Sequence, residues 1–118
     1  MISKKPGKQR KALYKAPMHK KHKLLGARLS KELTKQLKKR TLGIRSGDEV
    51  KVMRGNFKGK TGKITKVMLK KGRVFVENIK RNKVSGEEVN VPIHPSNLLI
   101  TSASMDDKKR KRITERKK

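Results

Sequence analysis

Cysteine and tryptophan are both absent from this 118-residue sequence, and other aromatic residues are scarce, with two Phe and one Tyr. Without cysteine the chain has no disulfide framework and no thiolate metal site, which fits a reducing cytosol. Because only 31% of the residues are hydrophobic, the core must be small and confined to one domain. Nothing in the sequence indicates a cofactor or a small-molecule substrate.

Long hydrophobic runs are also missing, since no uninterrupted apolar run exceeds three residues. A membrane-spanning helix needs about 20 apolar residues, and the apolar part of a signal peptide needs at least about 7. We therefore expect no membrane insertion, despite the basic N-terminal residues.

Negative charge is in short supply: 9 acidic residues stand against 36 Lys and Arg, which gives a formal net charge of +27. Such a charge opposes a compact isolated fold and favours a polyanionic partner, so an enzyme is not expected. The net charge is +15 over residues 1–45, +7 over 46–105 and +5 over 106–118. A moderately basic domain thus lies between two strongly basic arms.

The stretch 47–77 organises the rest of the chain. Val50 and Val52 alternate with charged residues, the period of a strand with one buried face. The loop that follows has glycines where the backbone must turn sharply or approach another backbone closely, and lysines around them. These are Gly55, Gly59 and Gly62, with Lys58, Lys60 and Lys63. Bare amides and several cations suit a loop that lies against phosphates.

Four more short strands are expected after this loop. The second strand is irregular, because Ile64 and Val67 cannot share one face by strict alternation, and a bulge near Thr65 and Lys66 would reconcile them. A third strand, 73–77, follows a Lys70-Lys71-Gly72 turn; a fourth spans 89–93, and the fifth spans 98–101. Five short strands favour a mainly β fold, a small SH3-like barrel.

Basic extensions flank the expected barrel, which we place at residues 41–103. In the extension 1–40, residues 1–16 lack periodicity and are interpreted as a polycationic arm, 17–25 as a short helix, and 30–40 as a helix capped by Ser30. The segment 104–118 is interpreted as a marginal charged helix, capped by Ser104, with Ile113 as its clear apolar anchor. Its alternative is a frayed tail that folds on RNA.

Three features that resemble catalytic or metal sites are weak. Residues 55–61 have three residues between glycines where a phosphate-binding P-loop has four, and a strand follows where that motif needs a helix. Glu87 and Glu88 are adjacent, so in a strand they point to opposite faces and cannot act as a pair. His19 and His22 have a spacing that metals can use, but no acidic residue or cysteine nearby completes a site.

Ten residues of the central stretch fall on the pattern of the KOW motif: Val50, Val52, Gly55, Lys58, Gly59, Gly62, Ile64, Val74, Val76 and Glu77. The basic run APMHKKHKLLGARLSKEL before this motif and VPIHPSNLLIT after it resemble the archaeal and eukaryotic form of the twenty-fourth protein of the large ribosomal subunit. The resemblance covers nearly the whole chain. It implies a structural protein of the large subunit in the cytoplasm, which binds rRNA near its 5′ end, assists early assembly and lies near the peptide exit tunnel.

The implied partners are large-subunit rRNA, neighbouring ribosomal proteins and factors that dock at the tunnel exit. Bacterial relatives have a longer hairpin where this chain has residues 80–88, which leaves the exit-tunnel role open. The candidate RNA-binding residues are those of the KOW loop, the following strand and turn, and the N-terminal extension. They are Arg54, Asn56, Phe57, Lys58, Gly59, Lys60, Lys63, Lys70, Lys71 and Arg73, with Arg10, Lys11, Lys15, His19, Lys20, Lys21, His22 and Lys23.

Two other classes of protein are compatible with parts of the sequence. A transcription elongation factor can carry a KOW domain, although only basic arms flank the motif here. A DNA-compacting protein is also basic and free of cysteine, yet it has no need of a glycine-rich barrel. Both remain alternatives to the ribosomal interpretation.

Overall fold

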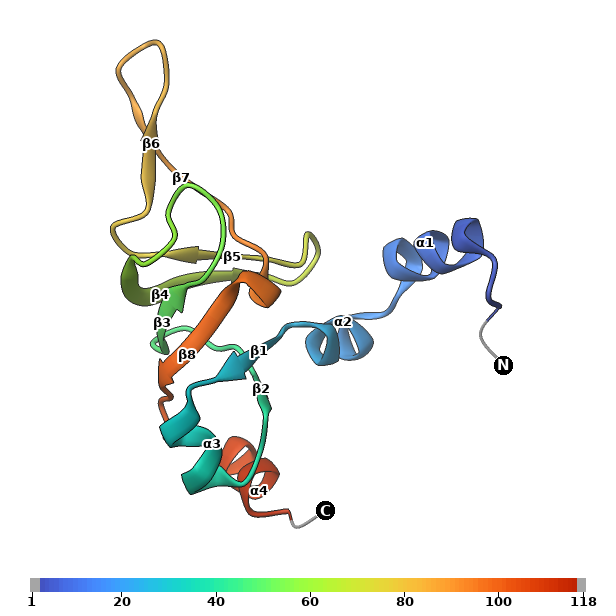
Figure 1. Cartoon of the computed structure of the whole chain (residues 1–118). Coiled ribbons are helices and arrows are strands. Elements are labelled where there is room, and N and C mark those ends of the chain that lie inside the picture. The colour runs from blue at the N-terminus through green and yellow to red at the C-terminus, as the bar shows by residue number, and fades with distance from the viewer. Residues whose placement is uncertain (1–2, 117–118) are drawn as a thin grey trace.

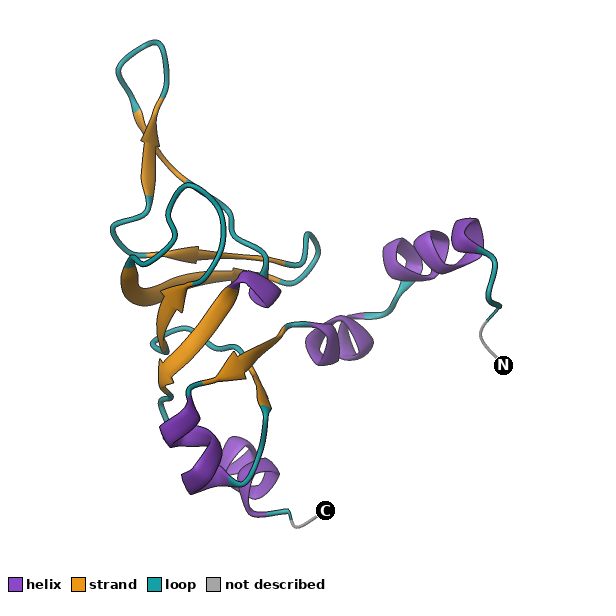
Figure 2. Cartoon of the chain, in the orientation of Figure 1, coloured by secondary structure: helices purple, strands orange, loops and turns teal. Residues whose placement is uncertain are grey.

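The computed structural model describes residues 3–116, a mostly β core with helices at both ends (Figure 1, Figure 2). In chain order the elements are α1 (Pro6–Lys15), α2 (Met18–Leu24), β1 (Gly26–Leu29), α3 (Lys31–Leu37), β2 (Thr41–Gly43), β3 (Glu49–Val52), β4 (Thr61–Met68), β5 (Arg73–Val76), β6 (Lys80–Asn82), β7 (Glu88–Asn90), the 3-10 turn η1 (Pro95–Asn97), β8 (Leu98–Ser102) and α4 (Lys108–Glu115). Residues 1–2 and 117–118, the ends of the two expected arms, lie outside the described residues.

Six strands form the main sheet, in the order β2-β1-β8-β3-β4-β5. Strand β1 runs parallel to β8, and the other neighbours are antiparallel. Strands β6 and β7 form a separate two-stranded hairpin. In Figure 1 this hairpin and the β3–β4 loop lie at one end of the molecule, and α3 and α4 lie at the opposite end.

The hydrophobic core lies along the inner face of this sheet. The alternation of apolar and charged residues determines which side chains enter the core. In β3, for example, the side chains of Val50 and Val52 are buried while Glu49 and Lys51 are exposed. The core cluster consists of Ala27, Leu29, Leu42, Ile44, Val50, Val52, Ile64, Val74, Val76, Ile79, Ile93, Leu98 and Ile100. Aliphatic side chains alone fill it, as expected for a chain with so few aromatic residues.

The observed sheet differs from the expected barrel of five strands in strand number and in closure. The sheet has six strands and is open, because β2 and β5 form its two edges. Strands β1 and β2 were missed because each has only three or four residues, too few to show a period of two. The expected strand 89–93 also divides: β7 pairs with β6 outside the sheet, and only Ile93 bridges back to Val74.

The irregular second strand is confirmed. The register of β4 against β5 shifts between Ile64 and Lys66, at the position where the sequence predicted a bulge. Close backbone approach is confirmed at Gly62, where an added Cβ would lie 2.6 Å from the carbonyl oxygen of Glu77. Only glycine allows β4 to pass β5 at this distance.

Helix α3 forms as predicted, and α4 begins differently. Ser30 caps α3 by accepting a hydrogen bond from the backbone N–H of Leu33 at 3.3 Å. The predicted cap of the C-terminal helix was Ser104, but Asp107 caps α4, accepting from the N–H of Lys109 at 2.8 Å. The Ser104 hydroxyl instead bonds Asp106, so the capping role falls to the residue next to the first helical turn.

Before β1 the chain contains two helices where one was expected. The segment 17–25 forms α2, as predicted, but residues 6–15 also form a helix, α1, although their apolar residues show no sustained period. No residue of either helix is buried, and both project sideways from the sheet in Figure 1. Among residues 3–116, no helix is long and apolar enough to cross a membrane.

Candidate nucleic-acid interface

The β3–β4 loop, residues 53–60, is closed at its base and open at its tip. The N–H of Val52 donates to the carbonyl of Lys60, and the N–H of Gly59 donates to the carbonyl of Val52, both at 2.8 Å. Gly55 and Gly59 both have φ of +90°, so the chain turns there through the left-handed region. The predicted glycine turns are thus present, and they hold the loop in one shape.

Side chains of this loop fall into two groups. Arg54, Asn56, Lys58 and Lys60 are exposed, as phosphate-binding groups must be. Phe57 is partly buried and packs against the core. The ammonium of Lys60 lies 5.3 Å from the centre of the Phe57 ring, so the same ring also positions this cation. Phe57 therefore anchors the loop beneath its exposed cations.

A second exposed basic cluster lies at the β4–β5 turn. Lys70 and Lys71 lie in this turn, where the N–H of Gly72 donates to the carbonyl of Leu69 at 3.3 Å, and Arg73 begins β5. The predicted basic hairpin turn is therefore present. Lys63, also a candidate, lies on β4 with its ammonium 3.9 Å from the Glu49 carboxylate. Its charge is shared with this neighbour, unlike that of the loop lysines.

The candidates of the N-terminal extension lie along α1 and α2. Arg10, Lys11 and Lys15 are exposed on α1, and the candidates of α2 are exposed except Lys21, which is half-buried. The Lys21 ammonium donates to the carbonyl of Tyr14 at 3.2 Å and so ties the two helices together. The basic candidates of the arm thus lie on two helices, and most of them are exposed.

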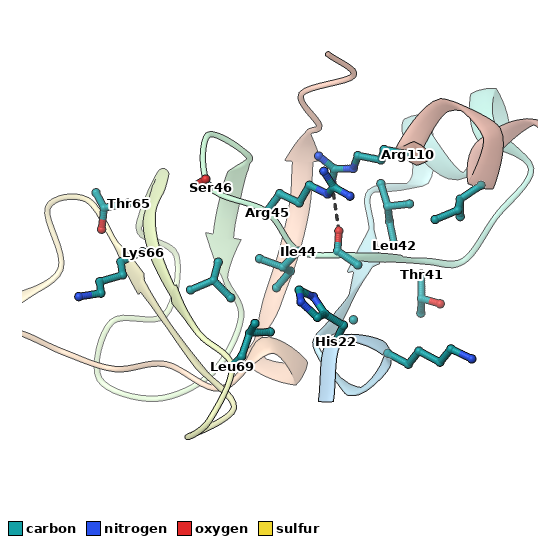
Figure 3. Close-up of a pocket in the computed structure, with 15 residues that line it drawn as sticks. His22, Thr41, Leu42, Ile44, Arg45, Ser46, Thr65, Lys66, Leu69 and Arg110 are labelled. Carbon is teal, nitrogen blue, oxygen red and sulfur yellow. Dashed lines mark hydrogen bonds between the residues drawn. The ribbon is translucent and has the colours of Figure 1, made fainter. Parts of the chain in front are cut away.

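A groove of about 830 Å³ brings α2 close to the strands (Figure 3). His22 and Lys23 of α2 line one side, Lys66 and Leu69 of β4 and its turn line the other, and Ile44 lies between them. Of the predicted RNA-binding residues, His22 and Lys23 line this groove, whereas Lys63, Lys70, Lys71 and Arg73 do not. The β3–β4 loop does not line this groove, so the candidates form more than one surface.

A buried ion pair beside this groove was not predicted. Asp48 and Arg110 are 0% and 2% exposed, and their side chains form two hydrogen bonds, at 2.6 and 2.7 Å. Arg110 also donates to the carbonyls of Gly43 and Ser104. The pair could not be predicted, because nothing in the sequence distinguishes Arg110 from the other basic residues around it.

Two carboxylates near the ends of elements have partners that the sequence did not reveal. The N–H of Lys109, and secondarily Arg45, hold the pKa of Asp107 below its usual value. The hydrogen bond and the charge of Glu88 raise the pKa of Lys80 across the β6–β7 hairpin. Glu87 pairs in the same hairpin with Lys83, at 3.1 Å. Glu87 and Glu88 therefore hold the hairpin together.

The third histidine of the chain, His94, has a structural role. Its ring Nδ1 accepts from the N–H of Ser96 at 3.3 Å and caps η1. No group of three or more potential metal ligands occurs in the part of the chain that the structure describes. What stands out is a cationic surface on loops and helices around a small sheet, the arrangement of a protein that binds a polyanion.

Comparison with known proteins shows which family of polyanion-binding proteins the chain belongs to. The sequence profile of the ribosomal proteins L26 of eukaryotes and L24P of archaea matches residues 3–117. The chain is also 48% identical over 113 residues to a protein of Pyrobaculum islandicum described as large ribosomal subunit protein uL24, covering 96% of this chain and 92% of that protein. The chain belongs to this family of ribosomal proteins, which is not a family of enzymes.

Proposed function

We propose that this protein is a structural constituent of the large ribosomal subunit and binds large-subunit rRNA through its basic loops and arms. Membership of the L26/L24P family carries the assignment to the ribosome, and hence to the cytoplasm. The related protein from P. islandicum is described as a large-subunit protein. With a net charge of +27, most of the binding free energy would come from Lys and Arg at phosphates.

Within this function we assign the β3–β4 loop to a KOW-type contact with RNA. The support is the loop geometry: two hydrogen bonds close its base, Phe57 anchors it, and the side chains of Arg54, Asn56, Lys58 and Lys60 remain exposed. A loop whose shape is fixed before binding loses little conformational entropy when it meets RNA. Shape recognition of this kind is typical of folded RNA.

The wider assignments follow from the family resemblance. We propose that the expected domain of residues 41–103, completed by β1, which pairs with β2 and β8, is an SH3-like unit with an open sheet, and that the basic segments before and after it lie along RNA. We place its site near the 5′ end of large-subunit rRNA, with a role in early assembly and a position near the exit tunnel. The β6–β7 hairpin is short, with residues 83–87 between its two strands, so a contact with factors at the tunnel exit would require them to come close to the sheet.

The role of the loop in RNA binding is tested by removing two positive charges from it and comparing the effect with the removal of two positive charges from another part of the chain. Arg54→Ala with Lys58→Ala should weaken binding of a 5′-terminal rRNA fragment about tenfold and reduce the slope of log affinity against log salt by about 1 to 2. The matched control is Lys31→Ala with Lys35→Ala, two exposed lysines of α3. Gly59→Val is a poorer test, because φ of +90° makes any side chain there strained before RNA is added.

Equal losses in the two double variants would contradict the loop assignment, since charge alone would then explain binding. Equal affinity of the wild-type chain for duplex DNA and for the rRNA fragment would contradict the ribosomal function and favour a DNA-compacting protein.

A further inference from the structure

We infer that the groove between α2 and β4 is a binding site for one unstacked nucleotide of single-stranded RNA, with His22 as the stacking partner of its base. The inference rests on the proposed function, because it takes RNA as the partner. It adds a site that differs in kind from the phosphate contacts of the loop.

The shape of the groove suits one nucleotide. Its volume of about 830 Å³ lies within the range of small-ligand sites, about 300 to 1,000 Å³. The side chains of Ile44 and Leu69 lie near its centre, with the imidazole of His22 beside them (Figure 3). RNA-binding proteins hold unstacked bases on such surfaces, with an aromatic or His ring on one face of the base.

The charges around the groove favour RNA over a protein segment. Lys23 lies on the α2 side and Lys66 on the β4 side, and both are exposed. Arg45 also lines the groove but is paired with Asp107, so we assign the flanking phosphates to the two lysines. All the residues that line the groove belong to the described chain, and none of them is acidic.

One buried nitrogen also lacks a partner at this site. The Nε of Arg110 has no hydrogen-bond partner within the described residues, although the rest of this guanidinium is paired, and Arg110 lines the groove. This nitrogen is fully buried, so a ligand in the groove does not reach it. Arg110 instead supports the groove wall, because it donates to the carbonyl of Gly43, while Arg45 pairs with Asp107 at the start of α4.

Histidine variants separate stacking from charge. The probe is a five-nucleotide single-stranded oligoadenylate, titrated into the full-length protein at constant salt. His22→Ala should weaken binding about tenfold, whereas His22→Phe, which keeps a flat ring, should stay within about twofold of wild type. His19→Ala is the matched control, because His19 lies on the same helix but does not line the groove. Because His19 is itself a candidate contact of the arm, its loss should weaken binding, but clearly less than His22→Ala does.

Methyl NMR spectra locate the base. The oligoadenylate should shift the methyl signals of Ile44 and Leu69 by ring currents and leave those of Val84 in the β6–β7 hairpin unchanged. A duplex of the same length should not move the groove methyls. Unmoved Ile44 and Leu69 methyls, or equal losses for His22→Ala and His19→Ala, would overturn the inference. Equal shifts with a hexaglutamate peptide would overturn it in favour of a protein partner.

Failure of this site and failure of the proposed function have different readouts. If the groove is empty of RNA but the ribosomal function holds, the rRNA fragment still binds and still loses affinity with the Arg54/Lys58 double variant. If the ribosomal function fails, the wild-type chain binds duplex DNA and the rRNA fragment equally well, whatever the oligoadenylate does.

Discussion

Helices α1 and α4 have similar lengths and similar basic compositions, but only α4 has a side chain in the protein interior. No residue of α1 is buried, and in Figure 1 it projects away from the sheet. In α4 Arg110 is 2% exposed and reaches Asp48, which also accepts from the backbone N–H groups of Arg45 and Ser104. The ion pair between buried Arg110 and Asp48 thus attaches the basic helix α4 to the sheet.

The contrast shows how a chain with few apolar residues can attach a cationic helix to its core. Apolar burial would be the usual means, but Ile113, the aliphatic residue of α4, remains 44% exposed. The Asp48 carboxylate serves as the anchor instead. It accepts hydrogen bonds from two backbone N–H groups as well as from Arg110, so its burial is well compensated. Among the described residues, no such acceptor holds a side chain of α1, and no residue of α1 is buried.

The largest expected effect is on the buried pair. Arg110→Ala leaves the Asp48 carboxylate buried without its ion-pair partner, and should lower the free energy of unfolding by about 3 to 5 kcal/mol. Urea denaturation followed by circular dichroism measures it. Lys111→Ala, on the exposed side of the same helix, is the control and should change stability by less than about 0.5 kcal/mol. Similar values for both variants would show that α4 is not anchored by Arg110.

A smaller effect is expected from the cap of α4 in acid. The pKa of Asp107 lies below its ordinary value of 3.8, so the cap stabilises the folded state above that pH and is lost as pH falls through the folded pKa. The protection of the Lys109 amide from exchange, relative to its intrinsic rate at the same pH, should therefore fall as pH drops below about 4. Asp107→Asn keeps a capping oxygen without a titrating group, and should show a weaker pH dependence there. An identical pH profile in both proteins would contradict this.

Shortening the exposed aliphatic side chain of α4 should have less effect still. Ile113→Ala should change the free energy of unfolding by no more than about 1 kcal/mol, because little of the side chain leaves an apolar environment. The same urea experiment measures it. A loss as large as that of Arg110→Ala would mean that apolar contact, and not the ion pair, attaches the helix.

Removal of α1 should have the smallest effect on folding and a clear effect on binding. Deleting residues 1–16 should leave the unfolding midpoint nearly unchanged, because α1 buries nothing. The deletion removes six basic residues, so the slope of log affinity for rRNA against log salt should fall by about 2 to 4. An unchanged slope would mean that the arm does not contact RNA.

The sequence predicts most of the local structure of this molecule. Alternation at Val50 and Val52 predicts β3, the mismatch of Ile64 and Val67 predicts the bulge of β4, and Ser30 predicts the start of α3. Each of these rests on residues that are neighbours in the chain. Glycine spacing likewise predicts the turns of the β3–β4 loop.

Contacts between distant residues were not predictable in this way. Strand β1 pairs with β8 about 70 residues away, so its four residues form a strand only because a partner edge is present. Asp48 and Arg110 are 62 residues apart, and eight basic residues near the C-terminus were equal candidates. For the candidate site, composition predicted a polyanion as partner, whereas the groove that joins α2 to β4 needed the fold.

We propose that this chain is a fixed component of the large subunit and contacts one region of its rRNA. Crosslinking of the protein to RNA in living cells, with sequencing of the attached fragments, tests it most directly. We predict reads concentrated in one short region near the 5′ end of large-subunit rRNA. Reads spread over nascent transcripts would contradict the account and favour a transcription elongation factor.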